Sequence, residues 1–205
     1  MKVYETKDLR NVGVVGHGDS GKTTLTAGLL FTSGATNRLL RVDEGNTITD
    51  FDEEEIQRKI SISTAVAVAE WNKTKLNLLD TPGYNIFIND TRAALVAADA
   101  ALVLVDGVAG VEVQTEKVWA FANEYNLPRA VIINKLDRER ADFQRALASI
   151  HEAFGIVWGT FAISLKSKRV HGFPGTASAF SYLGGSWSKV TDQWISPKVS
   201  LPLPD

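Results

Sequence analysis

The eight residues G-H-G-D-S-G-K-T at positions 16–23 constrain the fold of this chain more than any other stretch. They follow the pattern G-x-x-x-x-G-K-[ST], in which backbone N–H groups surround phosphate oxygens and glycines leave room for that approach. Lys22 provides a cation for the β- and γ-phosphates, and the Thr23 hydroxyl suits Mg²⁺, which prefers oxygen ligands. The residues that we expect at the phosphates are Gly16, His17, Gly18, Asp19, Ser20, Gly21, Lys22, Thr23 and Thr24.

The flanking residues bear on the alternative, which is a chance match in a Gly-rich turn. Residues 11–15 (N-V-G-V-V) form a short apolar run that predicts a strand, and residues 24–31 predict a helix. The N-terminus of that helix would face the phosphates, where its dipole favours negative charge. This context favours a phosphate-binding loop over a chance match.

Residues 33–61 form a long polar stretch that contains the acidic run D-E-E-E at positions 52–55. A loop of this length in a compact domain is usually functional or disordered. Two interpretations stay open: a segment that becomes ordered around a γ-phosphate, and a solvated acidic surface.

A second motif follows a predicted hairpin. Residues 62–71 and 75–79 read as strands joined by a turn, and the second strand ends in D-T-P-G-Y at positions 80–84. Asp80 would hold Mg²⁺ through a water molecule, and the Gly83 N–H would meet a γ-phosphate, with Thr81 and Pro82 completing the turn. Alone, this tetrapeptide is more often a simple turn, but its place behind a strand makes it informative.

A third motif, N-K-L-D, follows the predicted strand at residues 130–133. The Asp137 carboxylate can accept hydrogen bonds from N1–H and the 2-amino group of guanine, whereas adenine offers neither. We expect Asn134 to brace neighbouring loops and the Lys135 stem to cover the base. A surface loop is the alternative for the tetrapeptide alone.

The remaining pattern completes an α/β fold. Residues 101–105 predict a buried strand, and residues 94–98 close a helix. Residues 113–123 predict a helix with Trp119 and Phe121 as core candidates, and residues 142–154 predict an amphipathic helix that ends at Gly155. The fold class is therefore a P-loop NTPase G domain, with a mostly parallel sheet, one antiparallel hairpin strand and flanking helices.

Composition limits the partners and the compartment. The net charge is −2, so a strongly basic surface for nucleic acid is not expected, and the absence of cysteine excludes disulfides and thiolate metal sites. The N-terminus has no apolar signal core, and the apolar region at residues 93–105 is too short to cross a membrane. We expect a cytoplasmic monomer with no membrane contact and no sequence-specific binding of nucleic acid.

Taken in order, G-H-G-D-S-G-K-T-T, D-T-P-G-Y and N-K-L-D resemble the GTP-binding domain of translational GTPases, above all elongation factor G and its paralogues. The resemblance covers about residues 8–155. It implies binding of GTP and GDP with Mg²⁺, hydrolysis of GTP, and the ribosome as partner and activator in translocation. It also implies that Ser61, in R-K-I-S, replaces the family's magnesium-binding threonine. The implied metal ligands are Thr23, Ser61 and Asp80, and the implied catalytic residues are Lys22, Gly83 and Tyr84.

Three departures from the family pattern bear on activity. The family usually has a histidine at the position of Tyr84, and tyrosine, with a pKa near 10, cannot replace an imidazole as a titrating group at neutral pH. A tyrosine hydroxyl can still orient water. Gly18 stands where the family often has a bulkier apolar residue beside that water. The resemblance also stops near Gly155, before the family's further guanine loop and later domains.

Residues 156–205 differ in composition from residues 1–155, because they hold four of the six prolines and three of the five tryptophans. We expect residues 1–155 to be a truncated GTP-binding domain and the rest to be a divergent, irregular tail. A truncated or frame-shifted product is one origin. A closing strand is the other, because F-A-I-S-L-K at 161–166 resembles the strand and guanine loop of small GTPases, although we favour coincidence for so short a match.

Three hypotheses about function follow. The first is a GTPase of the elongation factor G type, with a ribosomal-protection or peptide-release GTPase as a variant. The second is a nucleotide-binding module with little or no turnover, which Tyr84 favours. The third is an unstable fragment without a cellular role, which the composition break near Gly155 favours.

Overall fold

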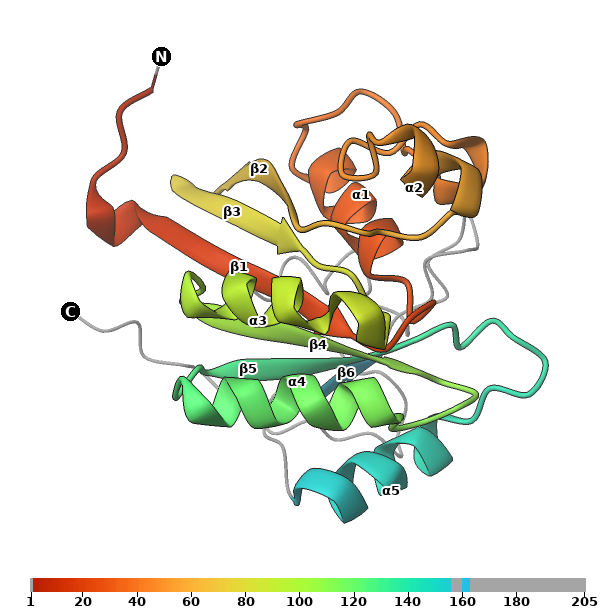
Figure 1. Cartoon of the computed structure of the whole chain (residues 1–205). Helices are drawn as coiled ribbons and strands as arrows, with labels where there is room; N and C mark the ends of the chain where they lie inside the picture. The colour runs from red at the N-terminus through yellow and green to blue at the C-terminus, as the bar shows by residue number, and fades with distance from the viewer. Residues whose placement is uncertain (1, 156–159, 163–205) are drawn as a thin grey trace, which may run out of the picture.

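The computed structural model describes residues 2–155 and 160–162, and its six strands there form one sheet in the order β2-β3-β1-β4-β5-β6 (Figure 1). The strands are β1 Leu9–Gly16, β2 Ala65–Trp71, β3 Thr74–Asp80, β4 Ala100–Asp106, β5 Arg129–Asn134 and β6 Thr160–Ala162. Only β2 and β3 pair antiparallel, and every other neighbouring pair is parallel. The predicted fold class, a mostly parallel sheet with one antiparallel hairpin strand, is confirmed.

Helices cover both faces of the sheet (Figure 1). The α-helices are α1 Lys22–Thr32, α2 Glu53–Arg58, α3 Ile88–Val96, α4 Val113–Glu124 and α5 Phe143–Phe154. Short 3₁₀ helices occupy Thr6–Asp8, Val42–Glu44 and Asn85–Phe87. Helix α1 contacts strands β1, β2 and β3 on one face, while α3, α4 and α5 pack on the other. No helix within the described ranges 2–155 and 160–162 combines the length and the apolar character that a bilayer span needs.

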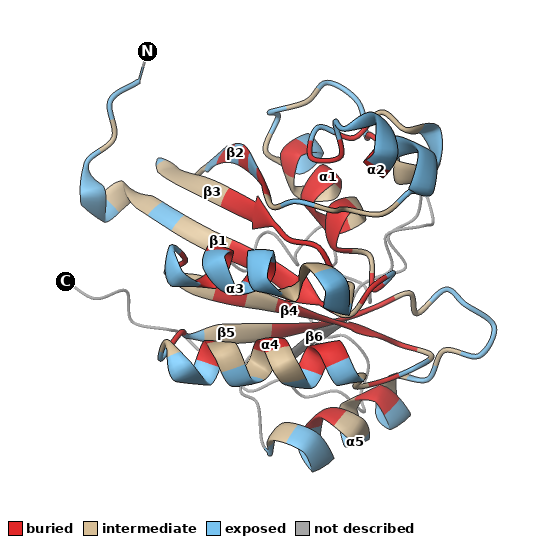
Figure 2. Cartoon of the chain, in the orientation of Figure 1, coloured by how far each residue is buried: buried red, intermediate tan, exposed pale blue. Residues whose placement is uncertain are grey.

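The two faces of the sheet bury different side chains of the same strand. Val14 packs with Leu25 of α1, whereas its neighbour Val15 belongs to the cluster beneath α3, α4 and α5. Because both faces are covered, the central strands are buried toward their carboxyl-terminal ends (Figure 2). The amphipathic helix is confirmed as well, since Ile150 is fully buried and Phe154 stacks on Trp119 with ring centroids 4.2 Å apart.

The order in which the chain adds strands to the sheet reverses direction at β1. Its two neighbours are β3 and β4, so the loops that follow β1, β3, β4 and β5 all leave the same edge of the sheet where these strands run parallel. In open α/β sheets ligands bind outside the carboxyl ends of the strands at such a switch point. The three sequence motifs begin at the ends of β1, β3 and β5 and are therefore neighbours in space.

Two stretches have more regular structure than a plain loop. The polar segment at 33–61 contains helix α2, which begins at a capping box formed by Asp52 and Glu55. In the tail, strand β6 pairs in parallel with β5. Its last two residues belong to the F-A-I-S-L-K stretch at 161–166, for which a closing strand is the less favoured of the two predictions. The proposed guanine loop around Ser164 lies outside the described residues, and the boundary at Gly155 stays a prediction.

Candidate functional site

The phosphate-loop motif lies between β1 and α1, and its lysine is buried. Only 6% of the Lys22 surface is exposed, and its Nζ donates a hydrogen bond of 2.9 Å to the His17 carbonyl. Removal from water lowers the pKa of Lys22 to about 8, although the charge of Asp80 acts in the opposite direction. A buried cation aimed into the loop fits an anionic ligand there.

The N-K-L-D motif touches the phosphate loop through its first residue. The Asn134 Nδ2 donates to the Ser20 carbonyl at 2.9 Å, in a buried position. Gly21 has φ +97°, and a Cβ on it would lie 2.3 Å from that Nδ2. A side chain at position 21 would therefore meet both backbone strain and a steric clash. Asn134 thus ties together two loops that are 114 residues apart in sequence.

The three residues expected to ligate Mg²⁺ lie near one another. The hydroxyl oxygens of Thr23 and Ser61 are 3.0 Å apart, and Asp80 is buried at the end of β3 with only 1% of its surface exposed. Asp80 Oδ2 accepts a hydrogen bond of 2.7 Å from Thr49, but its Oδ1 has no hydrogen-bond partner among the described residues. Burial raises the pKa of Asp80 to about 6. Two hydroxyls and an unpartnered carboxylate oxygen fit a hard divalent cation.

Two residues at this cluster were not expected from the sequence. Thr49 bonds to Asp80, and Asp50 accepts a hydrogen bond of 2.8 Å from Ser61. Both are buried, with 3% and 4% of their surfaces exposed. They lie in the polar stretch at 33–61, where a short T-D pair gives no local signal of contact with a strand end. Across the described parts of the chain, no group of three or more His, Cys, Asp or Glu side chains could hold a metal.

The D-T-P-G turn packs directly against the phosphate loop. Thr81 anchors it, because its Oγ1 donates to the Val14 carbonyl at 2.8 Å. A Cβ on Gly83 would lie 2.3 Å from the Lys22 Nζ and 2.7 Å from the Gly18 backbone nitrogen. Only a residue without a side chain fits there, so the Gly83 backbone lies close to the lysine and to the phosphate loop.

Tyr84 reaches across the phosphate loop. Its hydroxyl donates a hydrogen bond of 3.0 Å to Asp19 Oδ2, a contact that no sequence motif indicated. Burial raises the pKa of Tyr84, and the hydrogen bond to Asp19 adds to that effect. The phenol is therefore protonated near neutral pH.

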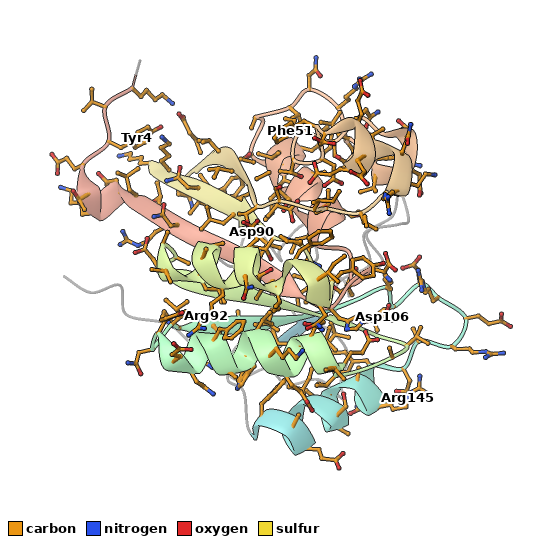
Figure 3. All side chains as sticks on the ribbon, viewed as in Figure 1. Tyr4, Phe51, Asp90, Arg92, Asp106 and Arg145 are labelled. Atoms are coloured by element: carbon orange, nitrogen blue, oxygen red, sulfur yellow. The ribbon has the colours of Figure 1, made fainter. Side chains whose placement is uncertain are left out.

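An ion pair joins Lys135 of the N-K-L-D motif to Asp106 at the end of strand β4. The Lys135 Nζ lies 2.8 Å from Asp106 Oδ2, and only 15% and 10% of these side chains are exposed. Burial acts to raise the pKa of Asp106, but Lys135 and the Val108 N–H together hold it below its ordinary value. Figure 3 labels Asp106, which ends strand β4, and Arg145 of α5. Arg145 donates a hydrogen bond of 2.9 Å to the Val108 carbonyl. Asp137 lies exposed in the turn that follows.

Glu55 holds the polar segment next to the metal-ligand cluster, and its removal gives a first prediction. It is 2% exposed, and its Oε1 accepts hydrogen bonds from the backbone N–H groups of Ile62 at 2.8 Å and Ser63 at 3.1 Å. We expect Glu55→Ala to lower the free energy of unfolding by about 2 kcal/mol, because three backbone N–H groups, including that of Asp52 in the capping box, lose their acceptor. Urea unfolding and amide exchange at Ile62 measure this.

The matched control is Glu53→Ala in the same helix. Glu53 is exposed, so its replacement should change the free energy of unfolding by less than about 0.5 kcal/mol. Equal losses for the two variants would show that Glu55 acts only through helix propensity and not through the loop.

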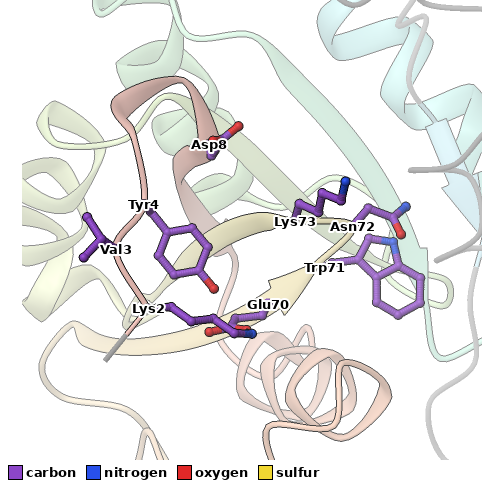
Figure 4. A pocket seen from close by; sticks show the side chains of 8 residues that line it. All are labelled: Lys2, Val3, Tyr4, Asp8, Glu70, Trp71, Asn72 and Lys73. Carbon is purple, nitrogen blue, oxygen red and sulfur yellow. The ribbon is translucent and has the colours of Figure 1, made fainter.

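A surface hollow lies at the other end of the hairpin and is separate from this site (Figure 4). It contains the ion pair between Lys2 and Glu70. Its lining residues are Lys2, Val3, Tyr4, Asp8, Glu70, Trp71, Asn72 and Lys73. None of them is a predicted site residue, and Asn72 and Lys73 form the β2–β3 turn, away from the end of β3 that carries Asp80.

The fold and the three joined motifs define the class of protein as a GTP-binding domain of the translational GTPases. The family described as "Elongation factor Tu GTP binding domain" matches residues 7–194, and the chain belongs to this family. Within it, the chain is homologous to elongation factor G and to its mitochondrial paralogue, ribosome-releasing factor 2.

Particular relatives share about two fifths of the aligned residues. "Ribosome-releasing factor 2, mitochondrial" of Culex quinquefasciatus is 44% identical over 151 residues, which are 74% of this chain and 20% of that protein. "Elongation factor G" of Granulibacter bethesdensis is 40% identical over 157 residues, 77% of this chain and 23% of that protein. The chain therefore spans about a fifth of the length of these relatives.

Solved structures agree with the fold. A crystal structure of a Thermus thermophilus protein has a TM-score of 0.69 at 43% identity, covering 73% of this chain and 22% of that one. A bacterial selenocysteine-specific elongation factor has a TM-score of 0.59 at 23% identity, covering 76% of this chain and 25% of that one, and supports the fold alone.

Proposed function

We propose that this chain binds GTP and GDP together with Mg²⁺ and hydrolyses GTP to GDP and phosphate. The observation that carries the proposal is the meeting of three motif loops at one edge of the sheet. The buried Lys22, the unpartnered oxygen of Asp80 and the close approach of Gly83 to the phosphate loop all support a triphosphate and a divalent cation there.

Each motif has a role in this proposal. Lys22 and the amides of residues 16–24 bind the phosphates, and Thr81 and Pro82 hold the turn that presents the Gly83 N–H. Thr23, Ser61 and Asp80 hold Mg²⁺, which would neutralise phosphate charge when bound. Asn134 and Lys135 shape the base pocket and Asp137 selects guanine. Tyr84 lies next to the phosphate loop and orients water.

The first experiment measures the affinity of the chain for GDP, GTP and ATP with Mg²⁺, together with its melting temperature. We expect guanine nucleotides to bind and to raise the melting temperature, because a ligand that binds only the folded state stabilises it. Preference for ATP would contradict the proposed base recognition. No binding at all would favour the third hypothesis, a fragment without function.

A second candidate is a nucleotide-binding module without useful turnover. The presence of Tyr84 in place of an imidazole favours it, because a protonated phenol is a poor proton acceptor at neutral pH. Phosphate release measured with and without ribosomes separates the two. Stimulation by ribosomes would support the GTPase and exclude the passive module.

The ribosome is the proposed partner, because the relatives are named as an elongation factor and as ribosome-releasing factors. Translocation is the role we propose, and ribosome release or protection are the alternatives that assays with translating and post-termination ribosomes distinguish. The monomeric state and the cytoplasmic location remain predictions from the sequence, since some relatives are named as mitochondrial.

A further inference from the structure

Two departures from the family pattern, Gly18 and Tyr84, lie against each other in this structure. A Cβ on Gly18 would lie 3.0 to 3.1 Å from three atoms of the Tyr84 ring. Such contacts are tighter than carbon atoms normally make, so the ring would have to shift. Gly18 is not among the glycines with positive φ, so contact with the tyrosine ring, and not backbone strain, is the obstacle that this structure shows to a side chain at position 18.

The backbone that carries Tyr84 is fixed on both sides. The turn before it is anchored by Thr81, which bonds to Val14 of β1, and by Pro82, whose carbonyl accepts a hydrogen bond of 2.8 Å from Thr91 of α3. Tyr84 itself is the N-cap of the 3₁₀ helix that leads into α3. The ring therefore projects from a well-anchored turn, next to Gly18 and Asp19 of the phosphate loop.

Asp19 sets that direction. A tyrosine hydroxyl has one proton to donate and two lone pairs that accept, and here the proton is donated to the Asp19 carboxylate at 3.0 Å. The lone pairs are then the available side of the oxygen. A hydroxyl that donates to a carboxylate becomes a better acceptor, because hydrogen bonds in a chain polarise one another.

We propose that Asp19 is a positioning residue for Tyr84 in GTP hydrolysis, and that Gly18 provides the space for the ring over the phosphate loop. In this arrangement the Tyr84 oxygen accepts a hydrogen bond from the attacking water and takes no proton. The water oxygen bonds to the γ-phosphorus, the bond from that phosphorus to the oxygen of the leaving GDP breaks, and the water proton goes to the released phosphate. The inference rests on the proposed GTPase function. It assigns to Asp19 a role that is separate from phosphate binding.

The test uses two uncharged substitutions of Asp19, one that removes the hydrogen-bond acceptor and one that keeps an acceptor oxygen. Asp19 has φ +59°, which glycine and asparagine tolerate better than alanine. Asp19→Gly removes the acceptor and Asp19→Asn keeps a carbonyl oxygen. We expect single-turnover GTP hydrolysis on ribosomes to slow about tenfold in Asp19→Gly and in Tyr84→Phe, and to recover largely in Asp19→Asn.

The double variant decides whether the two residues act as one unit. Asp19→Gly combined with Tyr84→Phe should be about tenfold slow, no slower than Tyr84→Phe alone, because Asp19 has no hydroxyl left to orient once the tyrosine is phenylalanine. A loss near a hundredfold would show independent roles and overturn the proposal. So would an Asp19→Asn variant as slow as Asp19→Gly.

A spectroscopic readout keeps this test separate from the GTPase activity itself. With ¹³Cζ-labelled tyrosine, the signal missing from Tyr84→Phe identifies Tyr84, and Asp19→Gly should shift it while Asp19→Asn shifts it less. An unmoved signal overturns the Asp19 contact. A moved signal in a chain that fails to hydrolyse GTP would reject the proposed function and leave the contact established.

A separate double-mutant cycle tests whether Gly18 provides space for the Tyr84 ring. Gly18→Ala should lower the melting temperature by about 2–4 °C when residue 84 is tyrosine, and should have no effect in the Tyr84→Ala background. Equal shifts in the two backgrounds would mean that Gly18 is needed for another reason.

Discussion

Replacement of Lys22 by methionine is expected to stabilise the nucleotide-free chain while it removes nucleotide binding. The difference between the ordinary pKa of 10.5 and about 8 in the folded chain corresponds to about 3 kcal/mol of unfavourable burial of the charged form. Methionine has a similar length and carries no charge. The shift to about 8 already includes the opposing attraction of Asp80, and the His17 carbonyl keeps the hydrogen bond from Ser20 Oγ at 2.9 Å, so we expect a gain on the order of 2 kcal/mol.

The pH dependence of this gain has a defined sign. Between about pH 8 and pH 10.5 the unfolded chain holds the Lys22 proton more tightly than the folded chain, so the stability of the wild type rises with pH in that window. The stability difference between Lys22→Met and the wild type should therefore be full below about pH 8 and vanish by about pH 10.5. Urea unfolding at pH 7, 9 and 10.5 measures this.

The affinity of Lys22→Met for nucleotide is expected to fall, although the stability of the nucleotide-free chain rises. Loss of a buried cation that meets phosphate should weaken the affinity for GDP about a hundredfold or more. The control is Lys7→Met, since Lys7 is exposed and pairs with the exposed Glu5. A nucleotide-free Lys22→Met chain less stable than the wild type would contradict the idea that this lysine is held at a cost for ligand binding.

Replacement of Asp137 by asparagine is expected to change which base is bound. The carboxylate would accept two hydrogen bonds from guanine, each worth about 1.5–3 kcal/mol, so we expect the affinity for GDP to fall about a hundredfold or more. Xanthine carries a carbonyl where guanine has its 2-amino group, and an asparagine amide can donate to that oxygen. Affinity for xanthosine diphosphate should therefore rise.

Titration with the two nucleotides measures this exchange. Glu139→Gln is the matched control, because it neutralises an exposed acid two residues away in the same turn. If both variants lose guanine affinity equally, the general charge of the turn matters and Asp137 does not read the base. If Asp137→Asn binds both nucleotides as the wild type does, guanine is recognised elsewhere.

Much of the fold could be predicted from the sequence because its signals are local. Residues 11–15 and 101–105 are apolar runs that only a covered sheet can bury, and the structure places both in central strands. The amphipathic pattern of residues 142–154 likewise predicted helix α5, whose Phe143, Leu147, Ile150 and Phe154 all lie in or against the core cluster. Strand β6 has only three residues and gave too weak a signal to be preferred.

The site was partly predictable for the same reason. A loop that must bring its backbone close to phosphate requires glycines and a lysine at fixed spacing, so the motif at 16–23 indicates its chemistry without any tertiary contact. The contacts of Asp19 with Tyr84 and of Thr49 with Asp80 join segments 65 and 31 residues apart. No local pattern encodes such pairs.

By itself, the sequence determined the class of fold, the three loops and the type of ligand they suit, because backbone geometry and residue chemistry within each motif are short-range properties. Only the tertiary structure decided which atoms of these loops are in contact. Asn134 bonds to the phosphate loop, Gly83 lies against Lys22, and the Tyr84 hydroxyl bonds to Asp19. These contacts depend on the order of strands in the sheet, which places β3 and β4 on the two sides of β1 and is set by packing across the whole domain.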